Sequence, residues 1–263
     1  MPEGDTVYQT ARRLTEELAG KSLVRGELRH PRLSTLDLAG RTVLGARSVG
    51  KHLFVRFDRA LSLHNHLGMD GSWRFFRPGA RVNHQARAVL ETDSTTAVGL
   101  NLHQMSLVAT PQEHRLVDHL GPDLLDADWS DEHATEAVAR LKAKPGTEIG
   151  VALLDQTIMA GVGNVYRAEV CFLLGVSPWT PVSEVDGAEV VRLSRELLLR
   201  NAMNVARSTT GDDRRDRRLW VYGRNRIGCL RCGGRVVAAS QGEDTRERVV
   251  YYCPRCQPGP RPG

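Results

Sequence analysis

The chain has 263 residues, of which 41% are hydrophobic and 25% charged, and its formal net charge is +5. A chain of this length and composition buries a sizeable core, most simply in two domains and a small appendage. It contains no apolar run near the roughly 18–20 residues of a membrane-spanning helix, and it does not begin with the basic and then apolar pattern of a secretory signal. We therefore expect neither a membrane protein nor a secreted one.

The first 120 residues mostly show the short alternation of β-strands. Only residues 6–18 have helical periodicity, and Gly20 then ends this helix. Seven β-prone runs follow it, separated by Gly, Asp and Pro: SLVRGEL, TVLGARSV, HLFVRF, SLHNHL, SWRFF, ARAVLET and TAVGLNL. Their spacing predicts an N-terminal antiparallel β-sandwich, which we assign to residues 1–125.

From about residue 130 the periodicity becomes helical. Four segments fit helices: EHATEAVARL, TEIGVALLDQ, VYRAEVCFLL and GAEVVRLSRELLLRNAM. Residues 208–218 lack an apolar anchor and are predicted to form a mobile loop. We assign residues 126–215 to a helical domain and residues 216–263 to a terminal β-hairpin, so the fold class is α+β. Cys171 lies in the apolar run VCFLL, which favours a buried packing residue over a nucleophile.

Four cysteines near the C-terminus have the spacing of metal ligands. Cys229 and Cys232 form one C-x-x-C pair, Cys253 and Cys256 form another, and twenty residues lie between the pairs. Paired thiolates separated by about 15–20 residues suit one tetrahedral structural zinc ion. The runs RVVAAS and RVVYY are β-prone, and QGEDTRE between them predicts a hairpin turn. Two disulfides and a rubredoxin-like iron site are the alternatives, although this use of cysteine fits a reducing cytosol.

Positive charge is concentrated in the C-terminal half. Residues 1–139 contain 16 lysines and arginines against 18 acidic residues, whereas residues 140–263 contain 20 against 13. Seven arginines lie in or beside the predicted finger: Arg224, Arg226, Arg231, Arg235, Arg246, Arg248 and Arg255. A basic region that carries a zinc hairpin is typical of nucleic-acid binding, and a merely solvated basic surface is the alternative.

The segment GVGN directly precedes one predicted helix. Gly161 and Gly163 allow positive φ angles and the close approach of a phosphate, and Asn164 suits the N-cap of that helix. Free backbone amides at a helix N-terminus bind anions. An ordinary connection between two helices is the alternative reading of this segment.

The N-terminus provides candidate chemistry. Removal of Met1 leaves Pro2 with a free secondary amine, which can attack a sugar aldehyde carbon and form an iminium ion. Such an amine already titrates at about 8, so it needs no buried pocket to become nucleophilic. Glu3 can act as the adjacent acid or base. An unremarkable chain start is the alternative.

Six segments together resemble one protein family. They are MPEG at the start, GKHLF at 50–54, HLGMDGSW at 66–73, LLDQTIMAGVGNVY at 153–166, LWVYGR at 219–224 and the terminal four-cysteine finger. In this order they resemble the formamidopyrimidine-DNA glycosylase/endonuclease VIII family of base-excision repair enzymes, over nearly the whole chain. The start MPEGDTV is similar to the endonuclease VIII-type branch of actinobacteria.

The resemblance implies roles for individual residues. By this resemblance, the helical domain corresponds to a helix-two-turns-helix domain. Pro2 corresponds to the nucleophile that attacks the anomeric carbon, and Glu3 corresponds to the proton donor. Lys51 matches a lysine that contacts phosphate next to the lesion. The iminium ion then permits β- and δ-elimination.

The same resemblance assigns DNA contacts. Asn164, preceded by Gly163, and Arg248 match the pair that holds the phosphates flanking the flipped nucleotide. Met69 matches a methionine that fills the space left by the flipped base, with a core methionine as the alternative. Glu169 matches an acidic residue of the motif helix. His64 and His66 share one face of a predicted strand, but without a third ligand we expect no metal there.

We therefore predict a bifunctional DNA glycosylase and AP lyase that removes oxidised bases, with pyrimidines favoured. Its expected partner is damaged DNA, duplex or single-stranded, and it is expected to act as a monomer in the cytoplasm with the nucleoid. The alternatives are a preference for oxidised purines, an AP lyase with weak glycosylase activity, and a non-catalytic binder of damaged DNA. Asp5 and Thr6 support the lyase alternative, because the family usually has proline and glutamate there. The arginine–phenylalanine pair of one branch has no counterpart in NLHQMSLVA, and the loop 208–218 matches neither branch.

Overall fold

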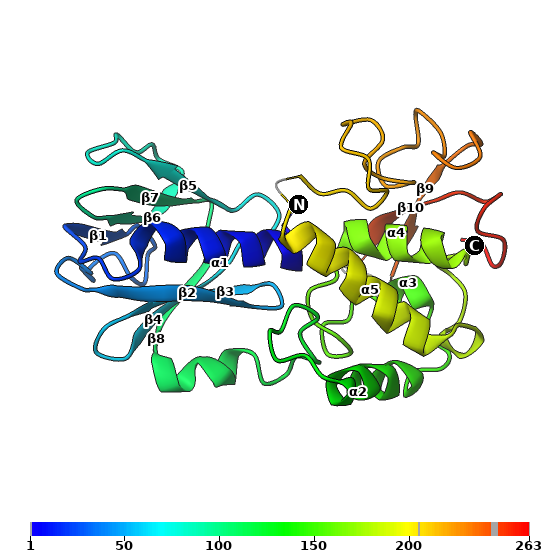
Figure 1. Cartoon of the computed structure of the whole chain (residues 1–263), viewed down its shortest axis with the longest axis horizontal. Helices are drawn as coiled ribbons and strands as arrows, with labels where there is room; N and C mark the ends of the chain where they lie inside the picture. Colours follow the sequence, from blue (N-terminus) through cyan, green and yellow to red (C-terminus); the bar gives the residue numbers. More distant parts are fainter. Residues whose placement is uncertain (1, 205, 243–246, 263) are drawn as a thin grey trace. The chain divides into compact units, whose positions relative to one another are not determined.

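The computed structural model describes residues 2–204, 206–242 and 247–262 (Figure 1). The chain divides into two compact units, Met1–His119 and Leu120–Gly263. The four-cysteine hairpin lies in the second unit, together with all the helices that follow residue 120. None of the described helices is long and apolar enough to cross a membrane.

The first unit begins with helix α1 (Gly4–Leu18), which starts two residues earlier than its periodicity predicts. Its apolar face is buried as expected: Val7, Ala11, Leu14 and Leu18. Each buried leucine stabilises the unit by about 1.5–3 kcal/mol. Just beyond the helix, Gly20 has a φ of 77° and donates its N–H to Val43 O at 2.8 Å.

Two four-stranded antiparallel sheets form the sandwich of this unit. One sheet has the order β1 (Arg25–Leu28), β6 (Ala86–Glu91), β7 (Thr96–Leu100) and β5 (Ser72–Phe76). The other has the order β2 (Val43–Val49), β3 (His52–Phe57), β4 (Leu61–His66) and β8 (Gln104–Ala109). Side chains from both sheets and α1 share one core. All seven predicted strands are present, and β8 is an additional strand within the NLHQMSLVA segment.

Beyond β8 a short 3₁₀ helix, η1 (Thr110–Leu116), covers the polar face of the second sheet. Its buried Glu113 bonds Arg56 Nη2 at 2.6 Å, Arg47 Nε at 3.0 Å and Ser62 Oγ at 2.6 Å. These partners hold the pKa of the Glu113 carboxyl below its ordinary value, although burial opposes them. Hydrogen bonds and charges therefore hold η1 on this face of the sheet.

The described residues of the second unit form four α-helices, one short 3₁₀ helix and one hairpin. They are α2 (Asp131–Lys142), α3 (Ile149–Ala152), α4 (Asn164–Leu174), η2 (Val182–Glu184), α5 (Gly187–Ala202), β9 (Val237–Gln241) and β10 (Arg248–Tyr252). Helices α2, α4 and α5 match predicted segments closely. The helix predicted over TEIGVALLDQ is wrong for most of its length, because only the four residues of α3 are helical.

Side-chain hydrogen bonds explain why α3 stops. Asp155 Oδ1 accepts from Thr157 N at 2.9 Å, and Gln156 Nε2 donates to Leu154 O and Val162 O, both at 2.9 Å. Such local bonds offer the backbone an alternative to continuing a helix. Helical periodicity alone does not reveal this competition.

The C-terminal hairpin pairs β9 with β10 antiparallel, and Arg248 lies opposite Gln241. Residues 243–246 of the predicted turn lie outside the described part of the chain. Val250 and Tyr252 of β10 share a core with Phe172 of α4. The hairpin is therefore packed on the helices rather than attached by a free linker.

The segment 208–218, predicted as a mobile loop, is closed by its own hydrogen bonds. Thr209 N donates to Arg218 O at 2.8 Å, and Asp212 Oδ2 accepts from Arg214 at 2.6 Å and from Arg217 at 3.0 Å. Ser208 and Thr209 are buried. Hydrogen bonds of polar groups therefore hold this segment in place, and apolar side chains do not.

Candidate functional site

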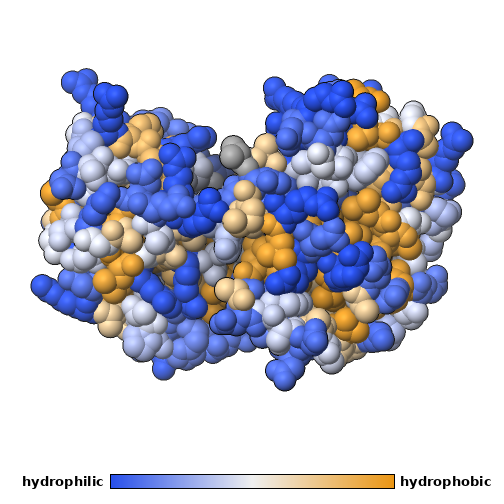
Figure 2. Space-filling view, in the orientation of Figure 1, coloured by the Kyte–Doolittle hydropathy of each residue, from blue (hydrophilic) through white to orange (hydrophobic). Residues whose placement is uncertain are grey.

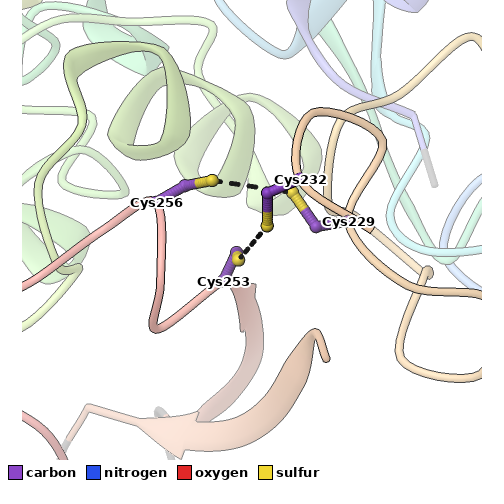
Figure 3. A group of neighbouring side chains, drawn as sticks. All are labelled: Cys229, Cys232, Cys253 and Cys256. Carbon is purple, nitrogen blue, oxygen red and sulfur yellow. Dashed lines mark hydrogen bonds between the residues drawn. The ribbon is translucent and has the colours of Figure 1, made fainter. Parts of the chain in front are cut away.

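The four cysteines of the hairpin converge as their spacing predicts (Figure 3). Their sulfur atoms all lie within 4.8 Å of one another, with 3.9 Å between Cys229 and Cys256 and 3.6 Å between Cys232 and Cys253. Four sulfurs at about 2.3 Å from a tetrahedral zinc ion are separated by about 3.8 Å, whereas a disulfide needs about 2.0 Å. The cysteines are free, so the disulfide alternative is wrong, and the cluster fits a single metal ion.

A backbone N–H of the first C-x-x-C turn favours the thiolate form of one cysteine. Gly234 N lies 3.4 Å from Cys232 Sγ, and this bond lowers the pKa of the Cys232 thiol to about 7. Gly233 has a φ of 68°, a conformation that favours glycine. Gln257, which the sequence did not single out, accepts from Cys253 N and donates to Val176 O, both at 2.9 Å. It ties the second pair of cysteines to the end of α4.

Most of the finger arginines are exposed. The exposed ones are Arg226, Arg231, Arg235, Arg248 and Arg255. Arg224 instead bonds Gly228 O through its Nε at 2.8 Å, and Arg246 lies outside the described residues. Figure 2 shows strongly hydrophilic residues gathered over the region of β9 and the loops beside it. This surface is suited to a polyanion.

The structure brings together two of the three predicted phosphate-contacting residues, Asn164 and Arg248. Asn164 is the first residue of α4, and its Nδ2 donates to Val249 O of β10 at 2.7 Å, directly beside Arg248. The predicted N-cap role of Asn164 is wrong, because Gly163 occupies the N-cap position with an extended φ of −124°. The side chain of Asn164 therefore bonds the backbone of the hairpin instead of capping its own helix.

Pro2, Glu3 and Lys51 all lie in the first unit. Glu3 is buried at the N-cap of α1, and Pro2 is half-buried before it. Lys51 and Gly50 form the two-residue turn between β2 and β3, where Val49 pairs with His52. Gly50 has a φ of 55°, which this tight turn requires.

The N-terminus of α1 and the turn between β2 and β3 lie at the same end of the first unit. Ala46 N donates to Thr15 Oγ1 at 2.8 Å, and α1 runs antiparallel to β2. From Thr15 back to Gly4 the helix rises about 17 Å at 1.5 Å per residue. From Ala46 to Lys51 the strand also extends about 17 Å at 3.3 Å per residue. The N-terminus of α1 and the tip of the β2–β3 hairpin therefore arrive side by side (Figure 1).

A cluster of histidines follows the turn that carries Lys51. It contains His64 and His66, which the sequence analysis considered, and also His52 and His119, which it did not. His52 Nδ1 is 2.9 Å from His64 Nε2, and the rings of His66 and His119 lie 5.6 and 6.1 Å from that of His52. Burial lowers the pKa of His52 and of His64 to about 4, and it lowers the pKa of His66 as well. The rings of His52, His64 and His66 are consequently neutral at pH 7. Among the described residues, the only group of three or more candidate metal ligands is the cysteine cluster.

Met69 and Glu169 have contrasting environments. Met69 is 73% exposed in the turn between β4 and β5, so the core alternative for this methionine is wrong. Glu169 is fully buried, and its carboxylate accepts from Trp220 N at 2.8 Å, from Val221 N at 2.9 Å and from the Thr209 hydroxyl. Tyr222 N donates to it as well, at 2.9 Å. Glu169 therefore anchors the LWVYGR segment beneath α4.

The chain combines a β-sandwich with an N-terminal helix, a helical unit and a four-cysteine hairpin. Residues 1–109 match the formamidopyrimidine-DNA glycosylase N-terminal domain, and residues 120–213 match the formamidopyrimidine-DNA glycosylase H2TH domain. A crystal structure of a complex between the Lactococcus lactis enzyme Fpg and DNA with an abasic site superposes with a TM-score of 0.81 at 23% identity, covering 98% of this chain and 100% of that one. This likeness confirms the predicted fold.

Two curated relatives match the chain end to end. "Probable endonuclease 8 2" of Streptomyces coelicolor is 50% identical over 100% of this chain and 97% of its own length. "DNA-(apurinic or apyrimidinic site) lyase Nei2" of Mycolicibacterium smegmatis is 44% identical over 98% of this chain and 99% of its own length. The chain belongs to the formamidopyrimidine-DNA glycosylase/endonuclease VIII family, and these similar relatives are endonuclease 8-type proteins from actinobacteria.

Proposed function

We propose that the protein is a bifunctional DNA glycosylase and AP lyase of base-excision repair, which removes oxidised bases with pyrimidines favoured. The observation that carries this proposal is the full-length likeness to endonuclease 8-type relatives, together with a chain start in which Pro2 and Glu3 precede α1. Damaged DNA is the partner, and a monomer working with the nucleoid in the cytoplasm is sufficient for this reaction.

Pro2 is the proposed nucleophile. Its amine attacks C1′ of the damaged nucleotide, the glycosidic bond breaks, and the base leaves with the bonding electron pair. Glu3 donates a proton to the deoxyribose ring oxygen, so that the ring opens and an iminium ion forms between Pro2 and C1′. Loss of a C2′ proton then expels the 3′ phosphate, and a second elimination expels the 5′ phosphate.

Lys51, Asn164 and Arg248 are the proposed phosphate contacts, with Gly163 supplying a backbone amide at the start of α4. Lys51 stands at the tip of a two-residue turn, and Arg248 is exposed at the start of β10. Held phosphates sustain a kinked duplex, which offsets the few kcal/mol needed to extrude the damaged base. The exposure of Met69 is compatible with filling the space that this base leaves.

We further propose that the metal ion of the hairpin is zinc and that it is structural. Four cysteine thiolates form a closed ligand set, which leaves no position for a reactant. The cysteines belong to the second unit and the proposed nucleophile to the first. Zinc therefore contributes to folding of the hairpin that carries Arg248.

An AP lyase with weak glycosylase activity is the second candidate. One 44% identical relative is named a DNA-(apurinic or apyrimidinic site) lyase. In addition, Asp5 is buried and its Oδ1 accepts from the Thr6 hydroxyl at 3.3 Å, in the place where the family usually has proline and glutamate. Thr6 occupies the position of that glutamate, so this chain lacks the carboxylate that a proton relay through position 6 would use.

Borohydride trapping on an abasic-site duplex tests the proposal. We expect a covalent adduct with the wild type and none with Pro2→Gly, which should still bind the duplex. An adduct that forms in undiminished yield in Pro2→Gly and maps to a residue other than the N-terminal one would refute the proline mechanism. A panel of duplexes with oxidised pyrimidines, oxidised purines or abasic sites then separates the first candidate from the second, because a lyase with weak glycosylase activity incises only the abasic duplex efficiently.

A further inference from the structure

Arg167 is a fully buried arginine on α4, one helical turn after Asn164. Its Nη2 donates to the side-chain oxygen of Asn164, to Val249 O at 3.1 Å and to Arg248 O at 3.3 Å. Its Nη1 lies 3.4 Å from Gln241 Oε1. Removing a guanidinium from water costs several kcal/mol unless hydrogen bonds compensate. One buried cation therefore bridges the start of α4 and both strands of the hairpin.

The bridge fixes the side chain of Asn164 at both ends. Its Oδ1 accepts from Arg167, and its Nδ2 donates to Val249 O at 2.7 Å. The same carbonyl of Val249 also accepts from Arg167. The position of Asn164 is thus linked, through two hydrogen-bonded atoms, to the backbone on which Arg248 stands.

A second layer of contacts holds Gln241 against Arg167. Gln241 Nε2 donates to Glu148 Oε2 and to Pro178 O, both at 2.8 Å, so its Oε1 faces the guanidinium. Gly150 provides the room for this arrangement, because a Cβ at that position would lie 2.3 Å from Gln241 Oε1. A side chain at residue 150 would therefore displace the amide group of Gln241 from its place beside Arg167.

We propose that Arg167 is a positioning residue that couples Asn164 to Arg248, so that the two phosphate contacts act as one unit, with Gln241 and Gly150 supporting it. This inference rests on the proposed function, since it assigns the support for two of its DNA contacts. Arg167 is buried and does not reach a phosphate itself. Loss of the bridge leaves each contact in place but unaligned with the other.

The sharpest perturbation is Gly150→Ala, because it acts on the bridge from α3 without removing any polar group. Its matched control is Gly146→Ala in the preceding loop, where an added Cβ meets nothing within 4 Å. For a duplex with an uncleavable tetrahydrofuran abasic analogue, we expect Gly150→Ala to raise Kd about tenfold and Gly146→Ala to leave Kd within twofold. An unchanged Kd in Gly150→Ala would overturn the proposal.

A double-mutant cycle separates positioning from general destabilisation. If the bridge aligns Arg248, combining Gly150→Ala with Arg248→Ala raises Kd by much less than the product of the single effects, whereas Gly150→Ala and Lys51→Ala multiply. Multiplicative effects in both pairs would mean that residue 150 acts only on stability. Arg167→Lys and Arg167→Met are measured alongside, with Arg167→Lys expected to retain more affinity because it keeps a donor.

A measurement without DNA keeps this inference distinct from the proposed function. The side-chain amide of Asn164, observed by NMR in the free zinc-loaded protein, should exchange slowly in the wild type and in Gly146→Ala, and faster in Gly150→Ala. Equal exchange in all three proteins would refute the coupling. If the wild type fails to bind the abasic duplex, the proposed function is wrong, and the exchange of Asn164 still decides whether the bridge exists.

Discussion

The substitution Glu169→Gln should destabilise the second unit strongly, although it preserves the shape of the side chain. Burial raises the pKa of Glu169, and the four hydrogen bonds that its carboxylate accepts, two at each oxygen, oppose this rise. Glutamine replaces one oxygen with an NH₂ group, which cannot accept. With the NH₂ in the place of Oε1, the N–H groups of Val221 and Tyr222 both face a donor. With the NH₂ in the place of Oε2, only Trp220 N is left unsatisfied, because the Thr209 hydroxyl can rotate to accept.

The second orientation is the less costly one and sets the expected magnitude. An unsatisfied buried donor costs about 1–3 kcal/mol, and hydrogen bonds to a charged group contribute about 1.5–3 kcal/mol each. We therefore expect Glu169→Gln to lower the free energy of unfolding by about 2–4 kcal/mol. The matched control is Thr209→Val, which removes one donor, leaves three, and should cost about 1 kcal/mol.

Urea unfolding of the zinc-loaded protein, followed by tryptophan fluorescence and circular dichroism, measures both effects. Amide hydrogen exchange should locate the weakened protection of Glu169→Gln at residues 220–222, the segment that the carboxylate holds. If Glu169→Gln destabilises the protein no more than Thr209→Val, the four-donor account of Glu169 is wrong. A loss of protection spread evenly over the unit would also contradict it.

Three further predictions concern other parts of the chain. The pKa of His52 and of His64 is about 4 in the folded protein and near 6.5 in the unfolded chain. The midpoint of urea unfolding should therefore be constant above pH 6.5 and fall as the pH drops towards 4. The substitution His52→Gln should make this fall less steep. The variant Cys253→Ser should lose the metal, as measured by atomic spectroscopy, and bind DNA weakly. The control Cys171→Ser should keep one zinc ion per chain. Metal retained in Cys253→Ser would contradict the proposed metal site. Lys51→Met should reduce the slope of log Kd against log salt concentration by about 0.9, and an unchanged slope would exclude a phosphate contact.

Local sequence pattern was enough to predict the elements that depend on it. The buried face of α1, seven of the strands, helices α2, α4 and α5, and the four cysteines of the hairpin all follow from periodicity and spacing. These signals are readable because a helix or a strand repeats its buried positions every 3.6 or 2 residues. The two C-x-x-C pairs are similarly local, since each turn presents its own two sulfurs.

Tertiary structure decided which polar residues work together. In the sequence, Arg167 and Glu169 resemble ordinary charges of an amphipathic helix, yet both are fully buried. Their partners lie far along the chain, at Val249 for Arg167 and at Tyr222 for Glu169. Likewise α3 is short because side chains beyond it bond the backbone. No periodicity records such hydrogen bonds, because they depend on which segments meet once the core has formed.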